Sequence, residues 1–121
     1  MNGNMVEHFK RALQQTEAER EPAHIAQLFA EGSALSNLGG DQTRDATEFW
    51  RVYLEQFTEI RSEFINEITA EGGAALEWKS RGRTKAGKPI DYRGVSLIEF
   101  DGEKLTGFRT YYDSAAFVRG L

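Results

Sequence analysis

The sequence contains no cysteine and only two histidines among its 121 residues. The absence of cysteine excludes disulfide bonds, a thiol nucleophile and a cysteine-ligated metal. The two histidines, His8 and His24, share no ligand-like spacing with carboxylates, and a zinc site cannot be assembled from them. We therefore expect neither a metal site nor a bound cofactor.

Long apolar segments and excess positive charge are also lacking. No run approaches the roughly 20 apolar residues that a membrane span requires, and residues 1–15 lack the apolar core of a signal peptide. A formal net charge of -4 argues against a nucleic-acid partner, because proteins that bind nucleic acids need a basic surface to contact the phosphates. We expect a cytoplasmic protein with neither a membrane nor a nucleic acid as its partner.

What remains has the length and composition of one globular domain. Hydrophobic residues make up 40% of the chain, and 12% of the residues are aromatic. A chain of this size buries roughly two thirds of its unfolded surface, which is enough for one core. We expect a single domain over residues 1–121, without linkers or internal repeats.

Helical spacing dominates the first half of the chain. Met5, Phe9 and Leu13 recur at intervals of four residues, which predicts an amphipathic helix over residues 4–20. A second helix should begin at Pro22.

That second helix should end at Gly32, where glycine permits a left-handed stop. A short strand over residues 33–38 follows. Asp41 or Thr43 can then cap a third helix. This third helix is the most aromatic, and its apolar positions are Ala46, Phe49, Trp50, Tyr53, Leu54 and Phe57.

After Phe57 the apolar period changes from 3.6 to 2, which is typical of strands with one wet face. Gly72-Gly73, Ala86-Gly87 and Asp101-Gly102 mark the turns between four long antiparallel strands. Helices followed by a run of strands predict an α+β domain in the order αα-β-α-ββββ.

Four pieces of the sequence carry a resemblance to a known family. They are LFAEGSAL at residues 28–35, Gly82 with Gly87, FDGEKL at residues 100–105, and Arg109-x-Tyr111-x-Asp113. With the element order, they make nearly the whole chain similar to the nuclear transport factor two-like superfamily, especially its SnoaL-like and ketosteroid isomerase-like members. The resemblance implies a conical barrel in which a curved, mostly antiparallel sheet wraps the third helix. It also implies an apolar pocket open at one end and a homodimer formed through the outer sheet faces.

The resemblance also indicates where catalytic groups of two related enzymes would fall. The tyrosine, the aspartate base and the second acid of the ketosteroid isomerases fall at Leu13, Asn37 and Ser96. The Asp-Arg-Asp group of limonene epoxide hydrolase falls at Glu77, Lys79 and Thr110. Both sets are replaced, so the resemblance supports the fold and does not support these two activities.

Strand alternation predicts which side chains face the pocket. If Ala86-Gly87 is a two-residue turn, Glu77 lies opposite Ser96 and both face inward. The same face then carries Tyr92, Gly94, Ile98 and Phe100 on the neighbouring strand, and Phe64, Asn66 and Ile68 on the strand before. The outer face carries Trp78, Val95 and Leu97.

The last hairpin has two possible registers. A two-residue Asp101-Gly102 turn places Leu105 and Arg109 inside. One further loop residue instead places a different set inside, and the resemblance favours this second register. That set is Phe108, Thr110 and Tyr112.

Glu77 is the candidate catalytic residue, because a carboxyl beneath apolar walls can serve as a general acid or base. It could instead lie exposed on the outer face, or pair with Lys79 or Arg93. Neutral hydrogen bonds inside the pocket would orient a ligand, although the same groups could satisfy buried backbone atoms. The candidate ligand contacts are Asn37, Trp50, Tyr53, Phe64, Ser96, Ile98, Phe108, Thr110 and Tyr112.

These observations predict a domain that binds a small apolar or weakly acidic organic molecule. If it is an enzyme, we expect a cofactor-independent isomerase, cyclase or hydratase. The alternative is a non-catalytic dimerisation, ligand-carrier or partner-docking domain. A basic row at Lys79, Arg81, Arg83 and Lys85 is either a solvated hairpin tip or a positive rim that attracts an acidic ligand.

Overall fold

The computed structural model describes residues 2–118 and contains three helices, five strands and one 3-10 turn. The order of these elements confirms the predicted α+β arrangement. Their bounds are α1 Asn2–Glu19, α2 Ala23–Ala26, β1 Phe29–Asn37, α3 Ala46–Glu55, β2 Phe57–Ala70, β3 Gly73–Thr84, β4 Pro89–Asp101, β5 Lys104–Tyr112 and η1 Ser114–Phe117. Within residues 2–118, no helix is both long and apolar enough to cross a membrane.

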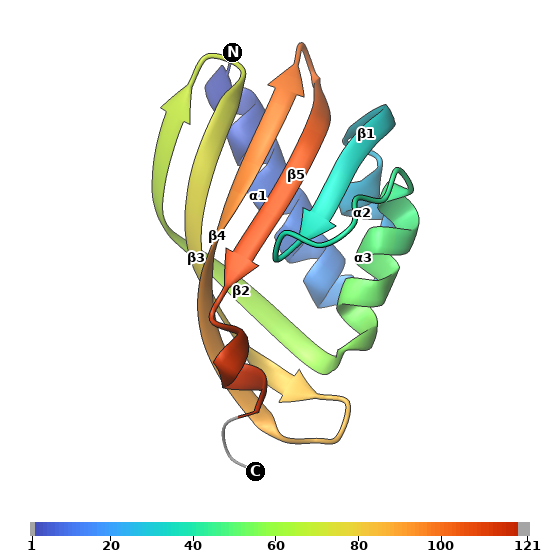
Figure 1. Cartoon of the computed structure of the whole chain (residues 1–121), viewed down its shortest axis with the longest axis vertical. Helices are drawn as coiled ribbons and strands as arrows, with labels where there is room; N and C mark the ends of the chain where they lie inside the picture. The colour runs from blue at the N-terminus through green and yellow to red at the C-terminus, as the bar shows by residue number, and fades with distance from the viewer. Residues whose placement is uncertain (1, 119–121) are drawn as a thin grey trace.

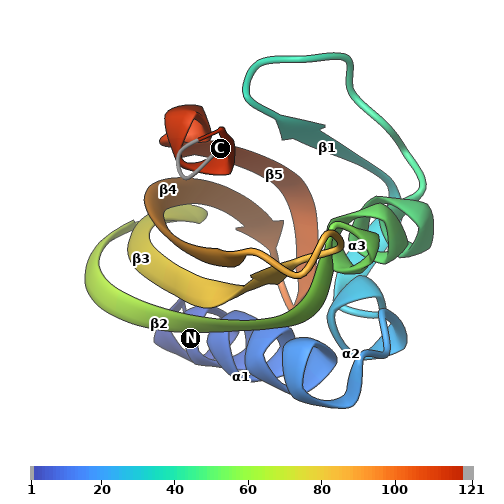
Figure 2. The same ribbon diagram turned by 90° about the horizontal axis from the view of Figure 1, so that it is seen from below.

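The five strands form one mixed sheet in the order β1-β5-β4-β3-β2. Strand β1 runs parallel to β5, and every other neighbouring pair is antiparallel. The sheet is strongly curved, as the view in Figure 2 shows. Strands β1 and β2 form its two edges and do not pair with each other in the described part of the chain, so the sheet is an open barrel.

Helix α1 supplies most of the helical side of the core. It crosses behind the strands in Figure 1 and packs against β2. Phe9 is fully buried, and its ring lies 6.3 Å from that of Phe64 and 5.8 Å from that of Phe108. The curved sheet wraps around helices, as predicted, and the third helix contributes Trp50 and Leu54 to the buried apolar side chains.

The second helix is shorter than predicted. It ends at Ala26, and Phe29 already pairs with Leu105 of β5. Gly32 has a φ of +82° and lies where the register of β1 shifts between Phe29 and Ala34, instead of ending the helix. The apolar side chain at position 29 therefore belongs to the sheet.

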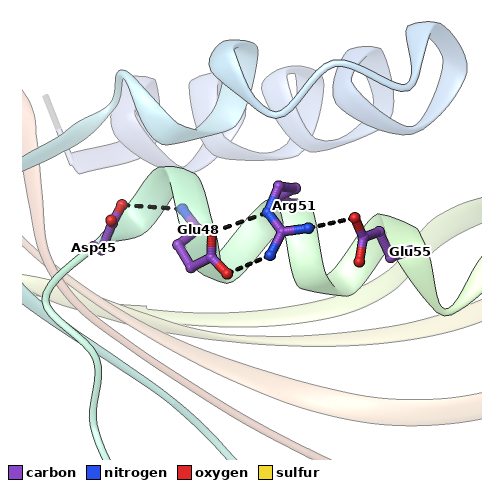
Figure 3. Close-up of polar contacts among 4 residues, drawn as sticks. All are labelled: Asp45, Glu48, Arg51 and Glu55. Carbon is purple, nitrogen blue, oxygen red and sulfur yellow. Dashed lines mark hydrogen bonds and ion pairs between the residues drawn. The ribbon is translucent and has the colours of Figure 1, made fainter.

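Helix α3 begins at a cap that differs from both predicted caps. The Oδ1 atom of Asp45 accepts a hydrogen bond of 3.0 Å from the backbone N–H of Glu48, which satisfies one unpaired donor of the first turn. Figure 3 shows this cap and the ion pairs of Arg51 with Glu48 and Glu55, one turn away on either side. These pairs stabilise the exposed face of the helix, because side chains three or four residues apart are neighbours on its surface.

The turn between β3 and β4 sets the register that matters most for the site. Thr84 and Lys88 close a loop of three residues, and Gly87 adopts a φ of +86°. The predicted turn had two residues. One extra loop residue shifts the pairing of β3 with β4 by one position. Because side chains alternate faces along a strand, this shift changes which residues of β3 lie on the same face as a given residue of β4.

As a result, Glu77 lies opposite Val95, and Leu76 lies opposite Ser96. The inward orientation predicted for Glu77 is therefore wrong, and so is the outward orientation predicted for Trp78, which is 8% exposed.

Two bulges change the alternation elsewhere. In β2 the register shifts between Phe64 and Asn66, so Asn66 and Ile68 are exposed, contrary to prediction; Ile68 is 71% exposed. In β5 an extra residue lies between Leu105 and Gly107, which pair with Phe100 and Glu99 of β4. Each of the two predicted registers is therefore right for one part of β5. Leu105 is buried, as the first register requires, and the side chains of the second register are also turned inward: Phe108, Thr110 and Tyr112.

Replacing Phe9 by alanine should lower the free energy of unfolding by about 3–5 kcal/mol, because the ring is fully enclosed and its removal leaves a cavity. Ile68→Thr is the matched control, since position 68 was predicted to be interior and is exposed. Its effect should stay within about 0.5 kcal/mol. Urea unfolding measures both values, and an equal loss in the two variants would contradict this placement of the core.

Candidate functional site

A cavity of about 270 Å³ lies between α3 and the sheet. Leu13 of α1 forms one part of its wall, while Trp50 and Tyr53 of α3 form another. Strands β3, β4 and β5 contribute side chains from their inward faces, and Phe117 of η1 closes one end. The cavity therefore lies where the apolar filling by α1 stops and the curved sheet continues.

The first aromatic cluster on the cavity wall joins α3 to β5. The ring of Trp50 lies 5.1 Å from Phe49, 5.6 Å from Tyr53 and 5.0 Å from Phe108, with edge-to-face geometry in each pair. Such pairs are favourable because the positive edge of one ring meets the negative face of the other. These four side chains hold α3 at a fixed distance from β5.

The second aromatic cluster joins four elements, β3, β4, β5 and η1, at the other end. Tyr92 of β4 lies 5.3 Å from Trp78, 5.5 Å from Tyr112 and 4.9 Å from Phe117, measured between ring centroids. All four side chains line the cavity. The C-terminal turn is thus part of the cavity wall.

Between the clusters, a row of polar side chains crosses the sheet. The indole Nε1 of Trp78 donates a hydrogen bond of 2.9 Å to the Oγ atom of Ser96. The hydroxyls of Ser96 and Thr110 lie 3.0 Å apart, and Thr110 pairs with Asn37 across β5 and β1. The hydroxyl oxygens in this row can also accept a hydrogen bond from a bound molecule.

Two buried polar atoms on the cavity-lining residues have no hydrogen-bond partner within residues 2–118. They are the Oδ1 atom of Asn37 and the Nε1 atom of Trp50. An unsatisfied buried donor or acceptor costs about 1–3 kcal/mol, and such atoms are rare in folded proteins. Both atoms belong to side chains that line the cavity.

A buried carboxylate lies directly behind the cavity wall. Glu17 of α1 is 3% exposed, and its Oε2 atom accepts hydrogen bonds of 2.6 Å from both the Tyr53 hydroxyl and the Ser62 hydroxyl. Its Oε1 atom accepts a third, of 2.8 Å, from the backbone N–H of Ser62. Ser80 extends this network, since its hydroxyl lies 2.6 Å from that of Ser62. Tyr53 and Ser62 line the cavity, so the carboxylate is connected to it through their hydroxyls.

Burial shifts the ionisation of these groups. It raises the pKa of the Glu17 carboxyl above the ordinary value of 4.5, and the hydrogen bonds from Ser62 and Tyr53 offset part of that rise. Burial also raises the pKa of the Tyr53 phenol, to which the Glu17 charge adds. The pKa of the Tyr92 phenol is raised for the same principal reason. Both phenols therefore stay neutral near pH 7.

Seven of the nine predicted ligand contacts line the cavity. They are Asn37, Trp50, Tyr53, Ser96, Phe108, Thr110 and Tyr112. Phe64 and Ile98 do not line it, because both pack into the core that α1 covers. Glu77 does not line it either, and its role as a cavity carboxyl is ruled out by the register of β3 and β4.

The cavity also contains residues that sequence reasoning missed, and Glu17 behind its wall was missed as well. A signal for Glu17 was present, because it lies four residues after Leu13 and eight after Phe9, on the apolar face of α1. Ser62 carried a signal too, because it lies two residues before Phe64 and shares its face of the strand. Trp78 carried none, since its orientation depends on the length of the loop between β3 and β4.

The basic row does not form a rim around this cavity. Lys79, Arg81 and Arg83 pair with acidic residues at 3.8, 3.4 and 3.5 Å, and none of the three lines the cavity. On the outer face of the sheet, Val95 and Tyr111 are 37% and 43% exposed. This face is the one on which a homodimer was predicted.

The buried carboxylate should make stability depend on pH. Because the pKa of Glu17 is higher in the folded than in the unfolded chain, its contribution to stability is complete below pH 4.5 and is lost as the pH rises through the raised pKa. The amide that replaces the carboxyl in Glu17→Gln does not titrate. The free energy of unfolding of this variant minus that of the wild type should therefore rise with pH, as measured by urea unfolding from about pH 4 to about pH 8. A difference independent of pH would contradict the raised pKa.

Comparisons with known proteins agree with this architecture. An NTF2-like protein from Anabaena variabilis superposes with a TM-score of 0.84 at 20% identity, over 95% of this chain and 91% of that one. A candidate SnoaL-like polyketide cyclase from Jannaschia gives 0.82 at 14% identity, over 97% and 88%. A protein of ketosteroid isomerase-like fold from Catenulispora acidiphila, in complex with trimethylamine, gives 0.78 at 16% identity, over 96% and 90%.

At these identities the likeness to solved structures shows the fold alone. No curated protein matches the chain. The model of the SnoaL-like domain family, however, matches residues 6–108, which is most of the sequence. The chain therefore belongs to the SnoaL-like domain family.

Proposed function

We propose that this protein binds a small, largely apolar organic molecule in the cavity between α3 and the sheet. The observation that supports this most directly is a cavity of about 270 Å³ with aromatic walls and two unpaired buried polar atoms. Ligand sites in proteins combine such apolar walls with a few polar groups that orient the ligand. Asn37 would accept a hydrogen bond from the ligand, and Trp50 would donate one.

Asn37→Leu separates binding from folding. Because its Oδ1 atom has no partner in the free protein, the variant should change the free energy of unfolding by less than about 1 kcal/mol. Its affinity for benzyl alcohol, whose hydroxyl can donate to Asn37, should fall about fivefold. Its affinity for toluene should not change.

The quantity to measure is the change in tryptophan fluorescence on titration. Thr47→Leu is the control, since Thr47 is exposed on α3 and does not line the cavity. An equal loss of benzyl alcohol and toluene binding in Asn37→Leu would contradict the role of the amide. Failure of the wild type to bind either probe saturably would contradict the proposed function itself.

Acid/base catalysis is a second candidate function, and it is favoured by the contact between Glu17 and Tyr53. Tyr53 would take a proton from a bound molecule while its own hydroxyl proton moves to the Oε2 atom of Glu17, 2.6 Å away. Returning the proton at another carbon would complete an isomerisation without a cofactor. In this role Glu17 replaces Glu77 as the proton carrier.

Exchange of the hydrogens next to the carbonyl of 2-tetralone, followed by NMR in D₂O, tests this second function. The wild type should accelerate exchange over buffer, while Tyr53→Phe and Glu17→Gln should return it to the buffer rate. Thr47→Leu should exchange as the wild type does. Full activity of Tyr53→Phe would exclude the proton path through its hydroxyl.

A non-catalytic role in dimerisation, ligand carriage or partner docking remains the alternative to catalysis. The homodimer stays a prediction, and the exposed Val95 and Tyr111 on the outer sheet face are the residues that support it. Burial of such apolar side chains is what a pairing surface requires. Cytoplasmic localisation likewise stays a prediction.

A further inference from the structure

The charge on the cavity wall has a single sign. Of the described residues that line it, none is lysine, arginine or histidine, and the one charged side chain is Glu48. A second carboxylate, Glu17, lies behind the wall and is joined to it by the Tyr53 and Ser62 hydroxyls. A bound anion would therefore meet no countercharge here, whereas a cation would meet only favourable charge.

Arg20, which directly follows α1, forms no ion pair with Glu17. The Nη2 atom of Arg20 donates instead to the backbone carbonyls of Leu54 and Phe57, at 2.9 and 2.8 Å. Within residues 2–118, Glu17 forms no ion pair, and its three hydrogen bonds all come from neutral groups. A buried carboxylate without a cation is uncommon, because charges in protein interiors are usually paired.

The aromatic side chains strengthen the same preference. Eight of the residues that line the cavity are aromatic, and they come from α3, β3, β4, β5 and η1. The face of an aromatic ring is negative, and several rings around one small volume attract alkylated ammonium groups, which lose little hydration on binding. Neutral hydrocarbons would fill the same space without this electrostatic gain.

We propose that the cavity selects an organic cation, an amine or quaternary ammonium with apolar substituents, and that Glu17 provides the charge that selects it. This proposal rests on the proposed function, because it names the class of ligand for the same cavity. It replaces the expectation of a weakly acidic ligand, since the basic row that suggested one lies outside the cavity, and three of its four residues pair with acids.

The surface of α3 next to the cavity fits this preference. Arg51 is held between Glu48 and Glu55, as Figure 3 shows, so this group carries one net negative charge. Arg51 does not line the cavity, whereas Glu48 does. The approach to the cavity along α3 is therefore also favourable for a cation.

Choline and its neutral carbon isostere, 3,3-dimethylbutan-1-ol, test the proposal with nearly the same shape. Phenyltrimethylammonium and tert-butylbenzene form a second, larger pair. The protein has two tryptophans, Trp50 and Trp78, and both line the cavity, so tryptophan emission reports on this site alone. We expect each cation to bind at least about tenfold more tightly than its isostere.

Glu17→Gln assigns the selectivity to the carboxylate. The variant should lose about tenfold in affinity for the cations and little for the isosteres, because glutamine keeps the size, and its one amide oxygen can still accept a hydrogen bond, while the charge is lost. Thr47→Leu should retain the wild-type affinities. If Glu17→Gln does not fold, the pH dependence of the wild type provides the same information.

Quaternary ammonium groups do not titrate, so any pH dependence comes from the protein. Affinity for the cations should rise with pH as Glu17 ionises and then level off, while that for the isosteres should not rise. The phenols of Tyr53 and Tyr92 lie close to Glu17, and burial raises their pKa values, so they stay neutral in this range. Glu17 also lines a second pocket, together with Arg20, Arg61 and Lys79. The hydrogen bond from Arg51 lowers the pKa of Glu48, so that carboxylate stays charged throughout.

The outcomes separate this inference from the proposed function. Tighter binding of the isosteres, or equal affinity within each pair, would overturn the selection of a cation while leaving a small-molecule site in place. Unchanged selectivity in Glu17→Gln, with no pH dependence, would overturn the role of Glu17. Absence of saturable binding by all four probes would overturn both.

Discussion

The hydrogen bonds accepted by Glu17 connect three elements across the core. Through Tyr53 they connect α1 to α3, and through Ser62 they connect α1 to β2. Burying a carboxylate is costly, and its three donors and their short geometry offset that cost only in part, as the raised pKa shows. Packing alone would place an apolar residue at this point of α1. The carboxylate is therefore the feature of the core that is best explained by a task at the neighbouring cavity.

The cavity exists because the sheet curves further than α1 can fill. Phe9 and the apolar side chains around it occupy the concave face near β5 and one end of β4. Beyond them, the sheet meets only α3 and η1, and two aromatic clusters span the gap. Large rings that pack edge to face keep their positions with few contacts, so the space between the clusters stays open. A hollow with rigid walls follows from this geometry.

The cavity wall carries three kinds of polar group: hydrogen-bonded hydroxyls, unpaired neutral atoms and carboxylates. The row from Trp78 through Ser96 to Thr110 is satisfied internally, while Asn37 and Trp50 each retain an unpaired atom. Satisfied groups stiffen the wall, and unpaired ones are free to orient a ligand. Charge enters only through carboxylates, and this distinguishes the cavity from the basic hairpin of β3 and β4.

Periodicity in the sequence determined the order of the elements and the apolar face of α1, because burial imposes the 3.6 and 2 residue periods locally. Together with the family resemblance, it also identified seven of the residues that line the cavity, including Asn37, Tyr53 and Ser96. Tertiary structure alone decided the rest. One additional residue in the loop closed by Thr84 and Lys88 turned Glu77 outward and Trp78 inward, and a bulge in β5 let Leu105 and Phe108 both face the core. Successive side chains of a strand point to opposite faces, so a register shift of one position moves every side chain of the strand to the other face. The local sequence pattern does not determine how many residues a loop contains.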